Sequence, residues 1–386
     1  MKALLFEIGC EEIPSRLIGR AARELAERVG AGLDAAGLER SEVSIYATPR
    51  RLALMLEVAA RQPDQHKELL GPPAKVAFDA AGQPTKAAIA FAQRNGVGVE
   101  ALRREATDRG EYVAVSLDIA GEDAAALIPG ILEDALAKLT WPKTMRWGSS
   151  RVQFIRPVHW LLALFGDDVL PMTFAGIQSG RATRGHRFLA PEVFEVADGS
   201  DWLARLRAAY VEPDMAVRRE MVIAGAKAAA TSVGGTIPFD DSLVEEVVGL
   251  SEWPVPMLGT FDEDYLALPP QVPVTVMKVH QRYFPVRDAA GALMAHFVLV
   301  AGTVVDDPAI VVQGNQRVLR ARLADASFFF EQDTSRDLEY YVERLGERIF
   351  LKGLGTMEEK AQRLADLSGR LAKRLTPGDP DAPARA

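Results

Sequence analysis

Two kinds of apolar spacing follow each other irregularly along this chain, and this constrains the fold most. From Leu52 to Val58 every second residue is a large apolar one, and this period of two indicates a strand with one buried face. After Pro14, apolar residues instead recur at helical spacing, at Leu17, Leu25, Val29 and Leu33. Because strands and helices mix without a steady βαβ alternation, we expect an α+β protein with mixed sheets and packed helices.

The same patterns predict the other elements. Strands are expected at 3–9, 42–47, 112–119, 274–283 and 296–304, and another apolar segment lies at 158–165. Helices are expected at 14–33, 85–95, 122–139, 213–233, 242–250 and 313–330. Gly71, Pro72 and Pro73 predict a rigid loop.

A chain of 386 residues is long enough for two or more domains, each with its own core. We divide it into an N-terminal α+β region at 1–140, a central α+β region at 141–335 and the start of a helical region at 336–386. In the last region an apolar helical stripe has no later element to pack against, and a linker-like tail, TPGDPDAPARA, follows it. Because a lone helix is only marginally stable in water, we expect that the natural protein continues or that a partner covers the stripe.

Positive charge is gathered into islands on an acidic chain. The formal net charge is −8, yet the stretch from Ala135 to Gly166 contains no acidic residue. This stretch carries the cations Lys143, Arg146, Arg151 and Arg156, which are interleaved with tryptophans and a phenylalanine. Two further windows without acids carry Arg184, His186 and Arg187, and Lys278 and Arg282. Cations beside aromatic faces suit a partner with phosphates and bases, although a solvated basic face over buried tryptophans is an equal alternative.

The helix expected at 313–330 adds two candidates. Arg317 and Arg320 are three residues apart and therefore share a face of this helix. The apolar residues that can supply its buried face are Val318, Leu319, Leu323 and Phe330. We therefore count both arginines as candidate contacts to nucleic acid or to a protein partner.

No catalytic motif accompanies these islands. The sequence contains no phosphate-binding glycine loop, no dinucleotide fingerprint and no G-x-S-x-G nucleophile elbow. None of the five histidines has a second histidine at metal-ligand spacing, so no metal site is expected in this chain. The single cysteine, Cys10, excludes an internal disulfide and fits a reducing compartment, and no apolar run is long enough to span a membrane. The chain therefore reads as a binding subunit, or as a fragment whose chemistry lies elsewhere.

Eight ordered motifs carry a resemblance to a known family. They are LLFEIGCEEIP (4–14), TPRRLAL (48–54), KTMRWG (143–148), FIRPVHWLLAL (154–164), TRGHRF (183–188), LVEEVVGLSEWP (243–254), MKVHQRYF (277–284) and GNQRVLRARLADASFF (314–329). Together they resemble the beta subunit of the bacterial two-subunit glycyl-tRNA synthetase. In the last motif Gln316 stands where the family has an acid.

The resemblance implies a cytoplasmic α2β2 heterotetramer that joins glycine to its tRNA(Gly) with ATP. The aminoacylation site, a class II core that uses ATP and Mg²⁺, belongs to the alpha subunit, so that no catalytic residue and no cofactor are expected in this chain. The beta subunit grips tRNA and assembles with the alpha subunit. The resemblance also implies that the region at 336–386 begins an HD-like helical domain.

Two rival functions remain open from the sequence. In one, the chain is a structural module whose islands bind only the alpha subunit, because arginine-rich aromatic patches also serve protein interfaces. In the other, it is an independent hydrolase, which would need histidine and carboxylate side chains converging in a pocket.

Overall fold

The computed structural model describes residues 1–79, 82–108, 110–149 and 151–385. Two compact units make up the chain. The first comprises 1–233, 237–257 and 298–308, and the second comprises 234–236, 258–297 and 309–386. None of the helices in the described ranges is both long and apolar enough to cross a membrane. The division of the chain at 140 and 335 stays a prediction.

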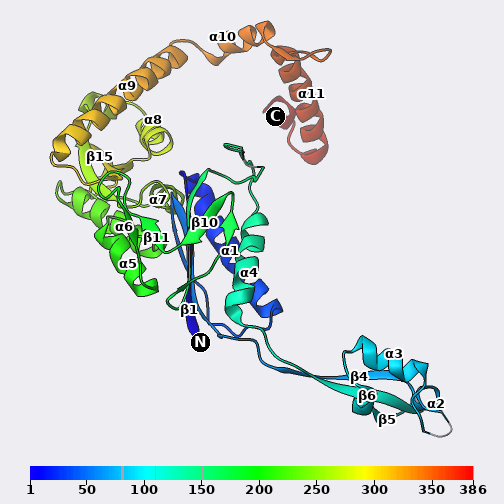
Figure 1. The fold of residues 1–386 in the computed structure, drawn as a ribbon. Helices are drawn as coiled ribbons and strands as arrows, with labels where there is room; N and C mark the ends of the chain where they lie inside the picture. Colours follow the sequence, from blue (N-terminus) through cyan, green and yellow to red (C-terminus); the bar gives the residue numbers. More distant parts are fainter. Residues whose placement is uncertain (80–81, 109, 150, 386) are drawn as a thin grey trace. The chain divides into compact units, whose positions relative to one another are not determined.

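A seven-stranded sheet forms the centre of the first unit (Figure 1). Its strands in spatial order are β2 (Ser44–Thr48), β3 (Arg51–Val58), β1 (Lys2–Cys10), β7 (Val158–Phe165), β10 (Ile177–Gly180) and β9 (Thr173–Phe174), and β8 (Asp168–Val169) pairs with β7. β1 pairs antiparallel with both β3 and β7, whereas β10 runs parallel to β7. The predicted mixed sheet is therefore confirmed.

Apolar cores cover both faces of this sheet. α1 (Ser15–Ala35) and α4 (Ala124–Ala137) pack on one face, and α5 (Gly199–Ala208) contributes Trp202 and Leu206 to the core on the other. The prediction that β3 has only one buried face is wrong for its first half, where Arg51 and Ala53 on the second face are 0% and 2% exposed, whereas Glu57 on that face is exposed. The second core, which includes Ala53, explains this burial.

A separate antiparallel sheet is formed within the segment 61–123, which we call the arm (Figure 1). Its strands in spatial order are β4 (Gln65–Pro73), β6 (Gly110–Ile119) and β5 (Arg103–Thr107), and it also contains α2 (Ala74–Ala77), α3 (Lys86–Arg94) and a 3₁₀ turn at Val99–Ala101. Its small core consists of Ala77, Ala88 and Val113. The loop predicted at 71–73 is wrong because these residues belong to β4, an edge strand where proline is tolerated.

The remaining elements of the first unit follow the main sheet in sequence. They are the hairpin of β11 (Ala182–Arg184) and β12 (Val193–Glu195), and the helices α6 (Met215–Thr231) and α7 (Asp241–Val248). α6 begins at an aspartate cap, since Asp214 accepts hydrogen bonds from the backbone N–H groups of Ala216 and Val217. Both helices lie close to the predicted ranges 213–233 and 242–250.

A three-stranded sheet has the order β13 (Val255–Thr260), β15 (Leu293–Ala301) and β14 (Phe284–Arg287). The strand predicted at 274–283 is wrong. α8 (Gln271–Thr275) and a π-helical segment, Val276–Gln281, stand there, and Pro273 occupies the first helical turn, where proline fits. The other elements are a 3₁₀ turn at Glu263–Ala267, α9 (Pro308–Thr334), α10 (Leu338–Glu343), a second 3₁₀ turn at Arg344–Glu347, β16 (Ile349–Leu351), β17 (Gly355–Thr356), α11 (Met357–Leu375) and α12 (Ala382–Arg385).

The predicted C-terminal stripe lies on α11, a helix that begins with a capping box. Thr356 accepts from the backbone N–H of Glu359, and the Glu359 carboxylate accepts from the backbone N–H of Thr356. Leu364 and Leu371 are about half exposed, at 52% and 49%. That another segment or a partner covers this stripe stays a prediction.

Gly9 is required where β1 passes the Trp160 side chain. A Cβ atom at Gly9 would lie 1.9 Å from Trp160 Cε2 and would overlap the indole. We predict that Gly9→Ala lowers the free energy of unfolding by about 1–3 kcal/mol, because a packed core resists an added methyl group. Urea denaturation followed by circular dichroism measures this. Gly130→Ala in α4 is the control, since its added Cβ meets open space and alanine favours a helix. Equal stabilities of the two variants would contradict the prediction.

Candidate functional site

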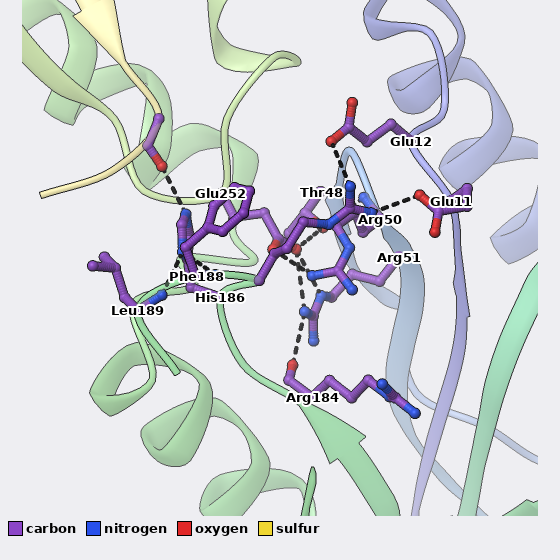
Figure 2. A network of polar contacts seen from close by, with 12 residues as sticks. Glu11, Glu12, Thr48, Arg50, Arg51, Arg184, His186, Phe188, Leu189 and Glu252 are labelled. Atoms are coloured by element: carbon purple, nitrogen blue, oxygen red, sulfur yellow. Dashed lines mark hydrogen bonds and ion pairs between the residues drawn. The ribbon is translucent and has the colours of Figure 1, made fainter. Parts of the chain in front are cut away.

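A buried ion-pair network joins segments that lie far apart in the sequence (Figure 2). The Arg51 guanidinium at the start of β3 is fully buried between two carboxylates. Its Nη1 lies 3.1 Å from Glu7 Oε1, and its Nη2 lies 3.1 Å from Glu252 Oε1. Nη2 also donates to the Arg184 carbonyl oxygen at 2.9 Å. Arg51 therefore ties β1, β11 and the segment after α7 to one point of the sheet.

Glu7 is the acceptor on which several buried donors converge. Trp160 Nε1 donates to Glu7 Oε1 at 2.7 Å, and Thr183 Oγ1 donates to the same oxygen at 2.8 Å. The indole of Trp202 donates to the other carboxylate oxygen. Because a buried carboxylate is costly unless its lone pairs are satisfied, these donors and Arg51 make its burial tolerable.

The second carboxylate, Glu252, is held ionised by the cations around it. Burial alone would raise its pKa, but Arg51, a hydrogen bond from Thr48 and Arg50 outweigh burial, and the net pKa lies below its ordinary value. Thr48 Oγ1 donates to Glu252 Oε1 at 2.7 Å. The TPRR turn between β2 and β3 thus supplies three of the groups that fix Glu252.

Trp160 lies between three guanidinium groups. The guanidinium carbons of Arg50, Arg51 and Arg184 lie 5.8, 5.5 and 5.9 Å from the centroid of its ring. A hollow of about 330 Å³ adjoins this cluster and is lined by Arg50, Trp160, Arg184 and Arg187, together with Glu11 and His159. The hollow presents three arginines and the carboxylate of Glu11 together, so that it is a mixed polar surface.

Arg50 is 9% exposed, and the atoms Nε and Nη1 have no hydrogen-bond acceptor within the described residues. Its Nη1 lies 3.6 Å from Glu252 Oε2, which is an ion pair without a hydrogen bond. Burial lowers the pKa of Arg50, although Glu252 opposes this effect. A buried guanidinium whose N–H groups lack acceptors is stabilised when a hydrogen-bond acceptor binds beside it.

The end of β11 and the loop after it contain three predicted contacts in different environments. Arg184 is exposed, whereas Arg187 is half-buried and pairs with Glu11, at 2.6 Å from Nη2 to Oε2. His186 is 5% exposed, its Nε2 lies 2.7 Å from the Gly302 carbonyl, and its Nδ1 accepts from the backbone N–H groups of Phe188 and Leu189. This pattern assigns a neutral ring with the proton on Nε2, which suits a structural role.

The predicted contacts in the long acid-free stretch divide into one internal and three exposed side chains. Arg156 is half-buried and donates from Nε to the Glu12 carbonyl at 2.9 Å. Lys143, Arg146 and Arg151 are exposed. The neighbouring Trp141 and Trp147 pack against the main core. Because both tryptophans are only partly buried, the choice between a binding surface and a solvated basic face stays open.

The other predicted contacts belong to the second unit. Arg317 and Arg320 are exposed on α9, whose buried residues are Leu319 and Leu323. Lys278 is half-buried in the π-helical segment. Arg282 ends that segment with φ at 57° and donates from Nη1 to the Val279 carbonyl at 2.6 Å.

Sequence reasoning missed the buried network around Glu7, Arg51 and Glu252. One signal was available, because Glu7 interrupts the otherwise apolar run LLFEIGC of a predicted strand. A charge inside a buried strand calls for a partner charge elsewhere in the chain. Within the described residues, no group of three or more histidine, cysteine, aspartate or glutamate side chains is placed to hold a metal ion.

Comparisons with known proteins give a consistent result. The family described as glycyl-tRNA synthetase beta subunit matches residues 4–386. The chain is 41% identical over 375 residues to the glycine–tRNA ligase beta subunit of Syntrophus aciditrophicus, which covers 97% of this chain and 54% of that protein. It is 43% identical over 377 residues to that of Erwinia tasmaniensis, covering 97% and 55%. It is 43% identical over 366 residues to that of Myxococcus xanthus, and this match covers 95% of this chain and 52% of that protein. The chain spans about half the length of these curated relatives.

We predict that Glu252→Gln lowers the free energy of unfolding at neutral pH by about 3–5 kcal/mol, because it removes a charge that compensates buried Arg51. The pKa of Glu252 is lowered from 4.5, so its contribution is present above pH 4.5 and is lost as pH falls through the lower folded pKa. The variant should therefore lose less stability on acidification than the parent does. Urea titrations between pH 7 and pH 3 measure both effects.

Glu12→Gln is the control for this experiment. Its carboxylate is 66% exposed and lies 3.6 Å from Arg187, so the change should stay within about 0.5 kcal/mol. If Glu252→Gln and Glu12→Gln unfold at the same urea concentration, the network does not carry the stability assigned to it.

Proposed function

The chain belongs to the family of glycyl-tRNA synthetase beta subunits, and from this premise we propose that it acts as the beta subunit of glycine–tRNA ligase. In this proposal the holoenzyme attaches glycine to tRNA(Gly) with ATP in the cytoplasm. The match of the family over residues 4–386 is the observation that carries the proposal.

We assign the chemistry to the alpha subunit, which holds ATP and Mg²⁺ in an α2β2 assembly. The beta chain then needs no activated nucleophile and no phosphate-binding loop, and its sequence contains none of the motifs that build them. Its work is to bind tRNA and to assemble with the alpha subunit. The region at 336–386, which contains α11, is proposed as the beginning of an HD-like helical domain.

The exposed cations are the side chains that we propose for tRNA contact. They are Lys143, Arg146, Arg151 and Arg184 in the first unit and Arg317 and Arg320 in the second. A phosphate backbone attracts such cations through charge and through the release of counterions. We give Arg156, Arg187, Lys278 and Arg282, which are half-buried, a secondary place, and His186, which is buried, a structural one.

A second candidate function is a module that binds only the alpha subunit while other parts of the beta subunit hold tRNA. The internal bonds of Arg156, His186 and Arg187 support it, because they leave fewer of the candidate cations for tRNA contact. The two candidates differ in whether the purified chain binds tRNA by itself.

We predict that replacing Lys143, Arg146 and Arg151 by alanine weakens tRNA binding. The affinity should also depend less on salt, so that the negative slope of log affinity against log salt becomes smaller in magnitude by about 2. Filter binding of tRNA at several salt concentrations measures the slope. The control replaces Lys2, Arg205 and Lys227, which are exposed cations outside the acid-free windows. An affinity that does not change with salt would contradict the tRNA contact and favour the second candidate.

We also predict that glycine, ATP and tRNA yield no glycyl-tRNA with this chain alone. Acid-gel or radiolabel assays of charged tRNA measure the product, and a reaction with the alpha subunit alone is the matched control. Product formed by the beta chain unaided would overturn the division of labour between the subunits.

A further inference from the structure

A basic cleft lies between α1, α6 and α7 in the first unit. It shares no lining residue with the hollow beside Trp160. Its volume is about 490 Å³. Its apolar lining includes Ile18 of α1, Met215 of α6 and Val248 of α7. None of the tRNA contacts proposed above lines it.

The charge of this cleft is opposite to that of the chain. Its lining includes five arginines, which are Arg16, Arg20, Arg23, Arg218 and Arg219, and two carboxylates, Glu245 and Glu246. The chain as a whole carries −8. An acidic partner is therefore repelled by most of the surface and attracted to this place.

Three of these arginines follow one face of α1. Arg16, Arg20 and Arg23 are spaced by four and three residues, which places them on neighbouring turns. All three are exposed, and Arg16 Nη2 lies 3.6 Å from Glu246 Oε2, which is a long ion pair. Arg20 donates to the Thr140 carbonyl and not to a carboxylate. Arg219 of α6 pairs with Asp241, so the charge offered to a partner is mainly that of the α1 arginines.

The fourth arginine, Arg218, is fully buried beside the cleft and is only partly satisfied. Its Nε donates to the Val248 carbonyl at 3.1 Å and its Nη1 to the Glu212 carbonyl at 2.6 Å. Its Nη2 has no acceptor among the described residues. Burial lowers the pKa of Arg218 to about 10, although the carboxylates of Glu252, Glu212 and Asp214 oppose this effect. Both of its hydrogen-bond acceptors are neutral carbonyls, so a carboxylate that enters the cleft can still bind the Nη2 group.

We propose that the α1–α6–α7 cleft is a docking site for an acidic protein segment that inserts an apolar side chain. The apolar lining favours such a segment over RNA, because phosphate recognition needs no apolar pocket and bases are held by exposed aromatic faces. The apolar side chain contacts the apolar lining of the cleft, and the carboxylates beside it pair with the arginine rim. If the proposed function holds, on which this step rests, the partner is the alpha subunit.

Charge reversal on the rim tests this proposal. Arg16→Glu with Arg23→Glu changes two exposed side chains of α1 and should weaken binding of the alpha subunit at least tenfold, measured by isothermal titration of the alpha subunit into the chain. The tRNA affinity of this variant should equal that of the parent. Lys2→Glu with Lys227→Glu is the matched charge-reversal control and should leave the affinity for the alpha subunit unchanged.

A second variant fills the cleft without changing its charge. Ala216 is exposed in the first turn of α6 and lines the cleft, so Ala216→Trp should block the apolar side chain and weaken binding by a similar factor. Thermal unfolding at the parental temperature shows that each variant is folded.

The outcomes separate this proposal from the proposed function. If the parent binds the alpha subunit and both variants bind it equally well, the cleft proposal is wrong and the function stands. If the variants lose tRNA affinity and keep the alpha subunit, the cleft is an RNA site and the docking proposal is again wrong. If the parent chain does not bind the alpha subunit at all, assembly with that subunit and docking in this cleft both fail.

Discussion

The Arg51 guanidinium, enclosed between Glu7 and Glu252, is the interaction on which the arrangement of the first unit depends. Its partners stand 44 and 201 residues away in the sequence, on β1 and after α7. Because a charge in a low-dielectric interior is tolerated only when it is paired, all three side chains must be in place for the sheet and its neighbours to close. The Trp160 and Trp202 indoles add neutral donors that fix the orientation of Glu7.

This buried network also positions the surface above it. The guanidinium groups of Arg50 and Arg184 lie beside the Trp160 ring, which the network holds in place. Thr183 and Arg184 both take part in the network, and the loop after β11 follows them directly. The exposed cation of Arg184 and the half-buried one of Arg187 are therefore carried on a rigid base. A binding surface on such a base loses little conformational entropy when a partner arrives.

Local patterns predicted most elements and few of the polar contacts. The helix at 14–33 was predicted within a few residues because its apolar spacing is regular, and the helix at 213–233 because Pro213 and Gly234 mark its ends. The segment 274–283 misled because its β-branched residues favour a strand, whereas packing makes it helical. Arg51 could not be predicted as buried, since the partners that permit its burial are distant in sequence. The exposure of Lys143, Arg146 and Arg151 followed from composition, but the pairing of Arg187 with Glu11 did not.

The two ends of the arm meet each other as they leave the rest of the unit. The backbones of Arg61 and Asp123 form an isolated antiparallel β-bridge, and the backbone N–H of Gln62 donates to the Glu122 carbonyl at 2.9 Å. The closure cost of such an excursion rises only slowly with its length, and its own core of Ala77, Ala88 and Val113 is complete without the main sheet. The arm can therefore be lengthened, shortened or exchanged between its two paired ends without altering the register of β1, β3 and β7.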